Sequence, residues 1–293
     1  MTDTINTREL IMNILLEMDR EKTPCHLAVR DALDKYQFLP RQDRAFIKRV
    51  CEGTVEYGIQ NDYIINQYSK IKINKCKPVI RAILRMSVYQ IRFLDAVPDS
   101  AVVNEAVKLA ERKGFTNLKG FVNGVLRNID RNVSNIQYPD KDNMVEYLSV
   151  RYSMPVWILE KWSACYDWEQ IERMLQGFFK ERGTTIRCNL NRISKEELVK
   201  KLQGEGVTVK QHPYLEYALV ISGYDYLGDL ESFEEGDFQV QDLSSMLVAE
   251  AAAPKEGDYV IDVCAAPGGK SLHIADKLKG TGHVEARDLT DYK

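Results

Sequence analysis

The sequence lacks the residue patterns that mark metal-binding, secreted and membrane proteins. Its six cysteines stand singly, without a CxxC pair or a Cys/His cluster at zinc-ligand spacing; this argues against a structural metal and fits a reducing compartment. The opening stretch MTDTINTREL has no basic segment of a secretory signal. The apolar stretch nearest in length to a membrane span is broken by Glu250. We therefore expect a cytoplasmic protein without a metal or a membrane partner.

The chain also lacks the overall positive charge of many nucleic-acid-binding proteins. Its formal net charge is −3 at pH 7, from 40 Lys and Arg against 43 Asp and Glu. These charges are unevenly spread: residues 70–92 hold seven basic residues and no acid, whereas residues 225–262 hold eleven acids and a single lysine. Such asymmetry predicts a basic surface in the first half of the chain. For any one of these lysines taken alone, a solvated helix face is the better explanation.

Helical periodicity dominates the first part of the sequence. Apolar residues recur at helical spacing through residues 1–137, and Pro40, Pro78 and Pro98 stand near the expected helix starts. We predict an all-helical domain over residues 1–137, followed by a helical linker over residues 138–182. The aromatic residues of the linker are interpreted as core in preference to base-stacking platforms.

Strand-like segments begin after Gly183. The stretch TTIRCNL alternates as a strand, Ser194 and Glu197 form a capping-box signature, and two more strand-like runs follow. This β-α-β-β order predicts a small α/β subdomain over residues 183–236. Residues 237–293 are assigned to the start of a further α/β domain.

Two polar residues open that last region. Asp242 and Ser244 precede an apolar helical run, and both residue types favour helix N-termini because their side chains can accept from free backbone N–H groups. We expect them to cap this helix.

The most informative stretch is Tyr259–Ser271, YVIDVCAAPGGKS, which predicts a strand, a glycine turn and a helix start. Its β-branched residues are typical of a strand covered on both faces in a parallel sheet. Gly268 and Gly269 permit positive φ angles and let a ligand approach the N–H groups at the helix start. The next strand, His283–Ala286, leads to Asp288. An acid at that place in a nucleotide-binding α/β unit accepts hydrogen bonds from ribose hydroxyls.

Two other interpretations of this turn compete with a nucleotide site. A phosphate-binding P-loop resembles the GGKS ending, but its pattern needs glycine where Cys264 stands. A glycine turn without a ligand explains the glycines. It leaves the convergence of Asp262, Lys270 and Asp288 on one strand edge unexplained.

The stretch DVCAAPGGKS resembles the S-adenosylmethionine motif of the RNA cytosine-C5 methyltransferases of the Sun/Fmu (NOL1/NOP2/Sun) family. The resemblance implies a Rossmann-like methyltransferase domain, with S-adenosylmethionine as cofactor. It carries over a loop that contacts the methyl donor and a carboxylate that binds the ribose. The loop positions are Cys264, Ala265, Ala266, Pro267, Gly268, Gly269 and Lys270, and the carboxylate is Asp288.

Two earlier segments, LRMSVYQIRFLDAVPDSAVVNEAVKLAER and GFVNGVLRN, resemble the NusB-type RNA-binding helical domain. Basic residues there would hold RNA phosphates without reading bases; the candidates are Lys119, Arg127, Arg81 and Arg85. The segment over residues 183–236 is similar to the reduced RNA-recognition fold of the family. Together the resemblances imply a monomeric 16S ribosomal RNA cytosine-C5 methyltransferase. A tRNA cytosine-C5 methyltransferase and a non-enzymatic RNA-binding or ribosome assembly factor remain alternatives.

The family's chemistry depends on cysteine. In the family a thiolate adds to carbon 6 of cytosine, which activates carbon 5, and a second cysteine assists product release. Both belong to Thr-Cys and Pro-Cys pairs on later strands, and no cysteine follows Cys264 here. Cys264 lies inside the donor loop and is a poor substitute. We assign no catalytic residue, and expect a chain truncated after the second strand of the methyltransferase domain and inactive as such.

Overall fold

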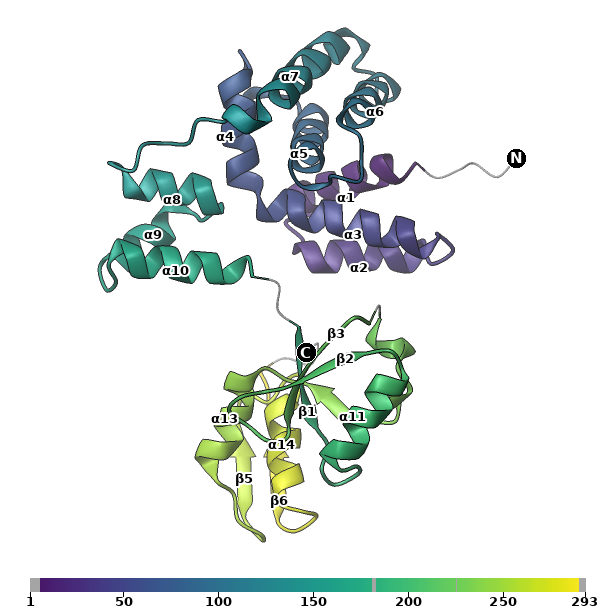
Figure 1. Ribbon diagram of the computed structural model, residues 1–293, viewed down its shortest axis with the longest axis vertical. Helices are drawn as coiled ribbons and strands as arrows, with labels where there is room; N and C mark the ends of the chain where they lie inside the picture. Colours follow the sequence, from purple (N-terminus) through teal and green to yellow (C-terminus); the bar gives the residue numbers. More distant parts are fainter. Residues whose placement is uncertain (1–5, 181–182, 225, 290–293) are drawn as a thin grey trace. The chain divides into compact units, whose positions relative to one another are not determined.

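The computed structural model describes residues 6–180, 183–224 and 226–289. It divides into two compact units, Met1–Lys180 and Glu181–Lys293. The first is helical and the second combines helices with two small sheets (Figure 1). Within the described ranges, no helix has the length and hydropathy required to cross a membrane.

Seven α-helices build the larger part of the first unit, which confirms the predicted all-helical region. They are α1 (Thr7–Glu21), α2 (Cys25–Lys35), α3 (Arg41–Glu56), α4 (Gly58–Tyr68), α5 (Pro78–Phe93), α6 (Asp99–Arg112) and α7 (Lys119–Asn132). The three prolines stand where the sequence predicted: Pro40 and Pro98 are N-caps, and Pro78 is the first residue of α5. Short 3-10 turns, η1 (Ile73–Lys75), η2 (Thr116–Leu118) and η3 (Val133–Asn135), lie between or after these helices.

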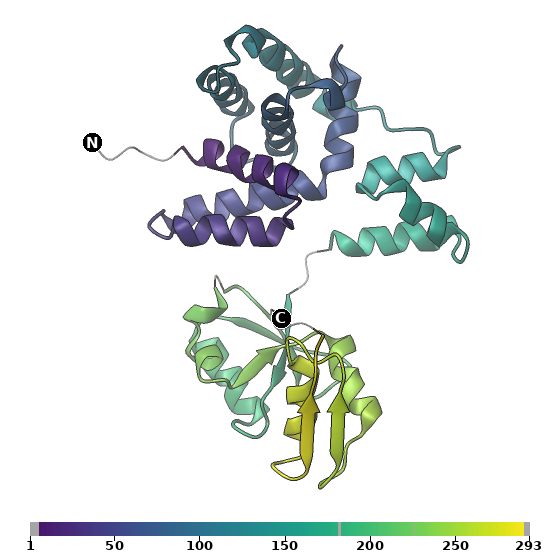
Figure 2. The same cartoon turned by 180° about the vertical axis from the view of Figure 1, so that it is seen from behind.

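Helix α5 is the centre of this bundle. It packs against α1, α3, α4, α6 and α7, and the view from behind also places it inside the ring of the other helices (Figure 2). Ten of its residues are buried, so its periodic apolar face supplies much of the core. Val55 on α3 is 45% exposed and lies outside this core.

Three shorter helices follow and form a small core of their own. They are α8 (Met144–Tyr152), α9 (Val156–Ser163) and α10 (Trp168–Phe178), packed around Leu148, Leu159, Ile171 and Leu175. The prediction that their aromatic residues are core is partly wrong. Trp157 and Phe178 are 65% and 63% exposed, because helices this short bury only one narrow stripe.

The second unit opens with a four-stranded antiparallel sheet in the order β2-β3-β1-β4. Its elements are β1 (Thr184–Cys188), α11 (Lys195–Gly204), β2 (Thr208–Gln211), β3 (Ala218–Ser222), η4 (Leu227–Asp229), α12 (Glu231–Glu234) and β4 (Phe238–Val240). Ser194 and Glu197 form the predicted capping box at the start of α11. The β-α-β-β-α-β order extends the β-α-β-β pattern expected from the sequence.

Strand β4 shows where that sequence pattern was incomplete. The segment was assigned to the following domain, beyond the proposed boundary at residue 236, yet Cys188 pairs with Phe238 and Ile186 with Val240. Phe238 is 1% exposed and belongs to the same core as Ile186. Three residues are too few for an alternation pattern to reveal a strand.

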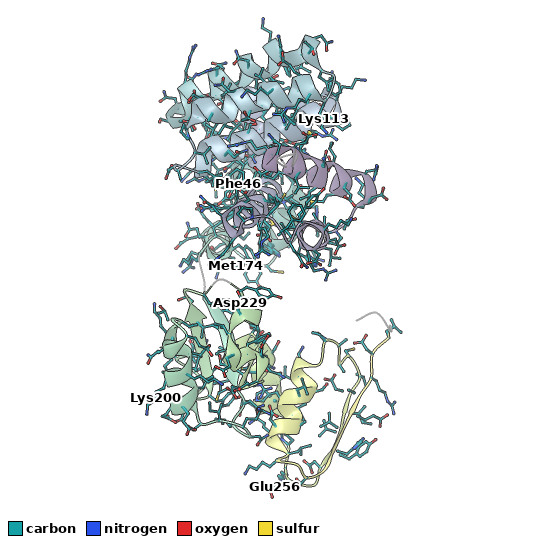
Figure 3. The ribbon with its side chains drawn as sticks, turned by 90° about the vertical axis from the view of Figure 1, so that its right-hand side faces the viewer. Phe46, Lys113, Met174, Lys200, Asp229 and Glu256 are labelled. Atoms are coloured by element: carbon teal, nitrogen blue, oxygen red, sulfur yellow. The ribbon has the colours of Figure 1, made fainter. Side chains whose placement is uncertain are left out.

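Two parallel strands and two helices complete the unit. They are α13 (Leu243–Ala252), β5 (Tyr259–Asp262), α14 (Gly269–Lys277) and β6 (His283–Ala286), with β5 paired to β6. Val260 and Val284 pack against α13 and α14 through a small core. The opposite face is exposed, with Ile261 at 48% and Val263 at 68%, and Figure 3 shows side chains projecting away from the helix on that side. The expectation of a strand covered on both faces is wrong for this chain, since both helices pack on one face.

Candidate cofactor site and RNA surface

The turn between β5 and α14 has the strand-turn-helix geometry that the sequence predicted. Gly268 adopts a φ of 101°, and α14 begins at the next residue, Gly269. A Cβ added at either glycine would meet no heavy atom within 4 Å. The first N–H groups of a helix have no intrahelical acceptor and carry partial positive charge. The turn therefore offers backbone donors to an anionic or polar ligand, beside two glycines that leave room for it.

Two carboxylates fasten the turn to the ends of the strands. Asp262, the last residue of β5, accepts from the Ser271 hydroxyl at 2.7 Å and from the Cys264 N–H at 3.2 Å. Asp288, just after β6, accepts from the Ala266 N–H at 2.9 Å. The predicted convergence of Asp262 and Asp288 at one edge is therefore present. Lys270 is exposed on the first turn of α14.

The exposed backbone and the carboxylate of this turn are compatible with a nucleoside ligand. A carboxylate can accept about four hydrogen bonds, so closing the loop does not prevent Asp288 from also accepting from ribose hydroxyls. Ala265, Ala266 and Gly269 are partly exposed beside it, and the small size of these residues lets a ligand approach the backbone. Cys264 is exposed within this turn.

A buried arginine joins the antiparallel sheet to helix α14. Arg187 on β1 is 2% exposed; its guanidinium donates to Gln241 at 2.8 Å and to Gln239 at 3.2 Å, and forms an ion pair with Asp276 on α14. Asn191 donates to the backbone carbonyl of Asp276 at 3.2 Å. The local sequence could not reveal this ion pair, because Asp276 lies 89 residues away from Arg187.

A second polar cluster lies at the same junction. His273 on α14 is 3% exposed, and its ring meets the ring of Tyr217 edge-on at 5.4 Å. Glu250 accepts from the Tyr217 hydroxyl and pairs with Lys277 at 2.8 Å. Burial, reinforced by Arg187 and Lys277, lowers the pKa of His273 to about 4. The imidazole is therefore neutral near pH 7. No local pattern in the sequence predicts this cluster.

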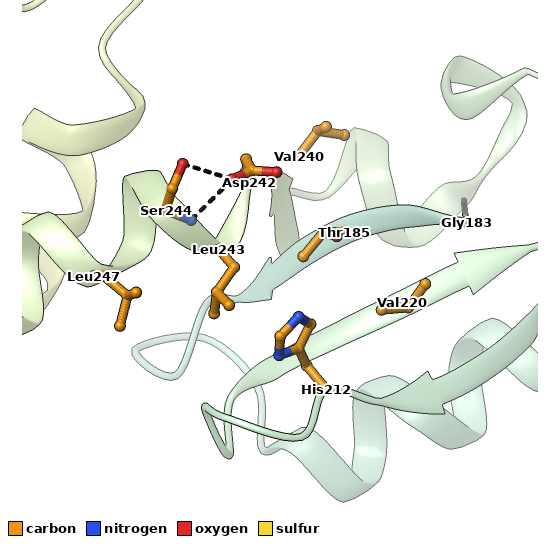
Figure 4. Close-up of a pocket in the computed structure, with 9 residues that line it drawn as sticks. All are labelled: Gly183, Thr185, His212, Val220, Val240, Asp242, Leu243, Ser244 and Leu247. Carbon is orange, nitrogen blue, oxygen red and sulfur yellow. Dashed lines mark hydrogen bonds between the residues drawn. The ribbon is translucent and has the colours of Figure 1, made fainter. Parts of the chain in front are cut away.

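A groove of about 720 Å³ lies between the antiparallel sheet and the start of α13. Figure 4 shows Asp242 and Ser244 at its rim, with the Ser244 N–H and hydroxyl both donating to the Asp242 carboxylate, at 2.8 and 2.7 Å. Asp242 is the N-cap of α13. The expectation of a cap is confirmed for Asp242. It is wrong for Ser244, which lies within α13 and whose hydroxyl donates to the Asp242 carboxylate.

Most of the cations proposed for RNA contact have acidic partners in the structure. Arg85 makes a bidentate pair with Asp62 at 2.6 and 2.7 Å. Arg81 lies 3.3 Å from Asp19, and Lys119 lies 2.8 Å from Glu111. Such pairs compete with phosphates for the same cations. Arg127, by contrast, forms no ion pair within the described part of the chain, and its role stays a prediction.

Comparison with known families matches three parts of the chain. The NusB family model covers residues 5–131. A ferredoxin-like domain of RsmF/B-like methyltransferases covers residues 154–224, and the 16S rRNA methyltransferase RsmB/F model covers residues 249–293. The strand order of the antiparallel sheet agrees with the second match, and the β5-turn-α14 unit lies inside the third. The chain thus combines a NusB-type domain with segments of a methyltransferase.

Curated relatives carry the same combination. The probable ribosomal RNA small subunit methyltransferase B of Bacillus subtilis is 32% identical over 288 residues, 98% of this chain and 64% of that protein. The protein of the same description from Synechocystis is also 32% identical, over 97% of this chain and 64% of the relative. The chain is similar over nearly its whole length to these two methyltransferases. It spans about 64% of the length of these relatives.

A solved structure supports the fold. The crystal structure of PH0851 superposes with a TM-score of 0.71 at 23% identity, covering 98% of this chain and 65% of the other. At this identity the similarity concerns the fold alone.

Proposed function

We propose that this chain supplies the RNA-docking and donor-binding parts of an S-adenosylmethionine-dependent 16S rRNA cytosine-C5 methyltransferase that acts in the cytoplasm as a monomer. The observation that carries the proposal is the turn after β5, where backbone donors, two glycines and the Asp288 carboxylate meet at the ends of two parallel strands. The match of residues 249–293 to the RsmB/F model and the relatives' descriptions support the same assignment. The beginning of a Rossmann-like sheet is the corresponding fold proposal.

Different groups of the turn would bind different parts of the donor. The N–H groups at the start of α14 and the loop over residues 264–270 would bind its polar end, and Asp288 would orient the ribose. S-adenosylmethionine, when bound, supplies the methyl group. Asp262 would keep the turn in shape through its bonds to Ser271 and Cys264.

Donor binding by the 293-residue chain tests this assignment directly. Titration calorimetry with S-adenosylmethionine should give saturable binding, and Asp288→Ala should weaken it by about 10- to 100-fold, because charge-assisted hydrogen bonds contribute roughly 1.5–3 kcal/mol. Asp288→Asn removes the charge but keeps a side-chain oxygen that can accept from the Ala266 N–H. It therefore separates the effect of losing the charge from the effect of losing the hydrogen bond that holds the loop. Glu256→Gln, an exposed acid just before β5 that Figure 3 labels, is the matched control. Equal affinities for all four proteins would remove Asp288 from the site.

The competing function is an RNA-binding factor without enzymatic activity. RNA binding with no donor binding by the chain would favour it. Reading the gene past the codon for Lys293 is a second discriminator, since the enzyme hypothesis requires the Thr-Cys and Pro-Cys pairs of the family. With the complete gene product, methyl transfer to deproteinised small-subunit rRNA should label a cytosine, whereas labelling of tRNA alone would contradict the substrate.

A further inference from the structure

The connection between α4 and α5 carries the densest run of lysines in the first unit. Residues 70–77 contain Lys70, Lys72, Lys75 and Lys77, and the sequence holds no acid between Asp62 and Asp95. All four lysines are exposed. They form no ion pair with any residue that the structure describes. In this they differ from Lys119, Arg81 and Arg85, whose charges are paired with carboxylates.

The backbone that carries these lysines is held in place. Ile73 is 3% exposed and belongs to the main helical core, and its N–H donates to the Asn66 side chain at 2.7 Å. The Lys75 N–H donates to the Lys72 carbonyl at 2.9 Å, and the Cys76 N–H donates to the Ile73 carbonyl at 3.1 Å. The lysines therefore extend from a short, anchored turn.

The turn also leads into the positive end of a long helix. Lys77 is the N-cap of α5, a helix of 16 residues whose first turn contains no acid and receives no side-chain cap. The free N–H groups and the helix dipole add positive potential at this end. The four lysines and the helix N-terminus are all positive, so their potentials add. On a surface where positive and negative charges are mixed, the potentials would largely cancel.

We propose that this lysine segment, residues 70–77, is a docking surface for the phosphate backbone of RNA. Lysines fixed at short intervals suit a row of phosphates, which they contact as point charges without reading bases. An anionic membrane is the other partner that such charge could attract. It is disfavoured because Ile71, 46% exposed, is the one large exposed hydrophobic in the described segment, whereas membrane-surface elements present a broad apolar face. The inference deepens the proposed function by placing its RNA partner, and it concerns a unit separate from the donor turn.

The test measures the salt dependence of RNA binding. Lys70, Lys72, Lys75 and Lys77 are all changed to Gln in the 293-residue chain, and binding to deproteinised small-subunit rRNA is measured by filter binding between 50 and 300 mM KCl. Each phosphate contact contributes about 0.7–0.9 to the slope of log K against log salt, so the slope should fall by about 3. The matched control changes Lys200, Lys210, Lys255 and Lys279, four exposed lysines of the second unit, to Gln. It alters net charge equally and should change the slope by less than about 1.

Three further measurements distinguish the possible outcomes. Both variants should retain the tryptophan fluorescence and melting temperature of the parent chain, since the exposed lysines support no packing; a folded variant with the parent's salt slope would overturn the inference. Vesicles of phosphatidylserine and phosphatidylcholine form the second arm, where loss of vesicle binding together with intact RNA binding would assign the segment to membranes instead. Donor titration of the same variant should match the parent. Absent donor binding in every protein would refute the proposed function while leaving the RNA result interpretable.

Discussion

Replacing Arg187 should lower the stability of the second unit and leave the stability of the first unit unchanged. In Arg187→Met the apolar chain length is kept, while Asp276 loses its ion-pair partner and Gln241 and Gln239 lose a donor. Removing one member of a buried ion pair costs about 3–5 kcal/mol. The Asp276 side chain keeps 28% exposure, so water can partly solvate the remaining carboxylate and the lower end of that range applies. With the hydrogen bonds included, we expect a loss of roughly 3–4 kcal/mol.

The distribution of tryptophan provides an internal reference for this experiment. All three tryptophans, at 157, 162 and 168, lie in the first unit, so the fluorescence transition in urea should stay unchanged. Hydrogen exchange followed by mass spectrometry should instead show faster exchange in peptides from β1, β4 and α14. The expected change is about 100-fold or more, if exchange follows opening of the unit.

Two further variants test whether loss of the ion pair causes the faster exchange in the second unit. Arg192→Met removes an exposed cation that lies 3.9 Å from the buried Asp237 carboxylate. Asp237 keeps its ion pair with Lys201 at 2.8 Å, so little change is expected. Adding Asp276→Leu to Arg187→Met should recover part of the loss, because the double variant leaves no buried charge unpaired. Exchange rates in α14 that match the parent in Arg187→Met would refute the reasoning.

Two other predictions concern the same unit. Gly282→Ala should cost more than about 2 kcal/mol, since φ is +70° and the new Cβ would lie 2.3 Å from the Asp258 carbonyl oxygen. Gly257→Ala, at φ +85° in open space, should cost about 1–2 kcal/mol, and hydrogen exchange in the peptides of the second unit measures both losses. His273 should make stability fall as pH drops from 6.5 towards 4: its folded pKa of about 4 lies below the usual 6.5, so the unfolded chain takes up the proton first. The parent should lose up to about 3 kcal/mol more than His273→Gln over that window, and identical pH profiles would contradict this.

The elements that the sequence predicted best are those with a repeated local signal. The first unit's helices have long apolar stripes and prolines at their starts, and Ser194 and Asp242 cap helices as their side-chain chemistry predicts. The turn at Gly268 was predictable because few residues besides glycine tolerate its backbone conformation.

What escaped prediction depends on long-range pairing. Strand β4 is three residues long and is defined by its hydrogen bonds to β1. These bonds produce no periodic pattern in the sequence. The burial of β5 depends on which elements cover each face, and a run of β-branched residues cannot specify that. The partners of Arg187 and His273 come from distant positions, so neither the ion pair nor the lowered pKa could be read from local sequence.

The same limit applies to charge, and it changes which residues are the best candidates for RNA contact. The sequence offered Lys119, Arg127, Arg81 and Arg85 as candidates, but Lys119 lies 2.8 Å from Glu111. A cation with a carboxylate partner must exchange that partner for a phosphate, and the exchange returns little net free energy. A cation that faces water gains the full release of counterions when RNA binds. The number of unpaired lysines on one anchored segment is therefore a better guide to an RNA surface than the number of lysines in a stretch, which favours residues 70–77 over the arginines of α5.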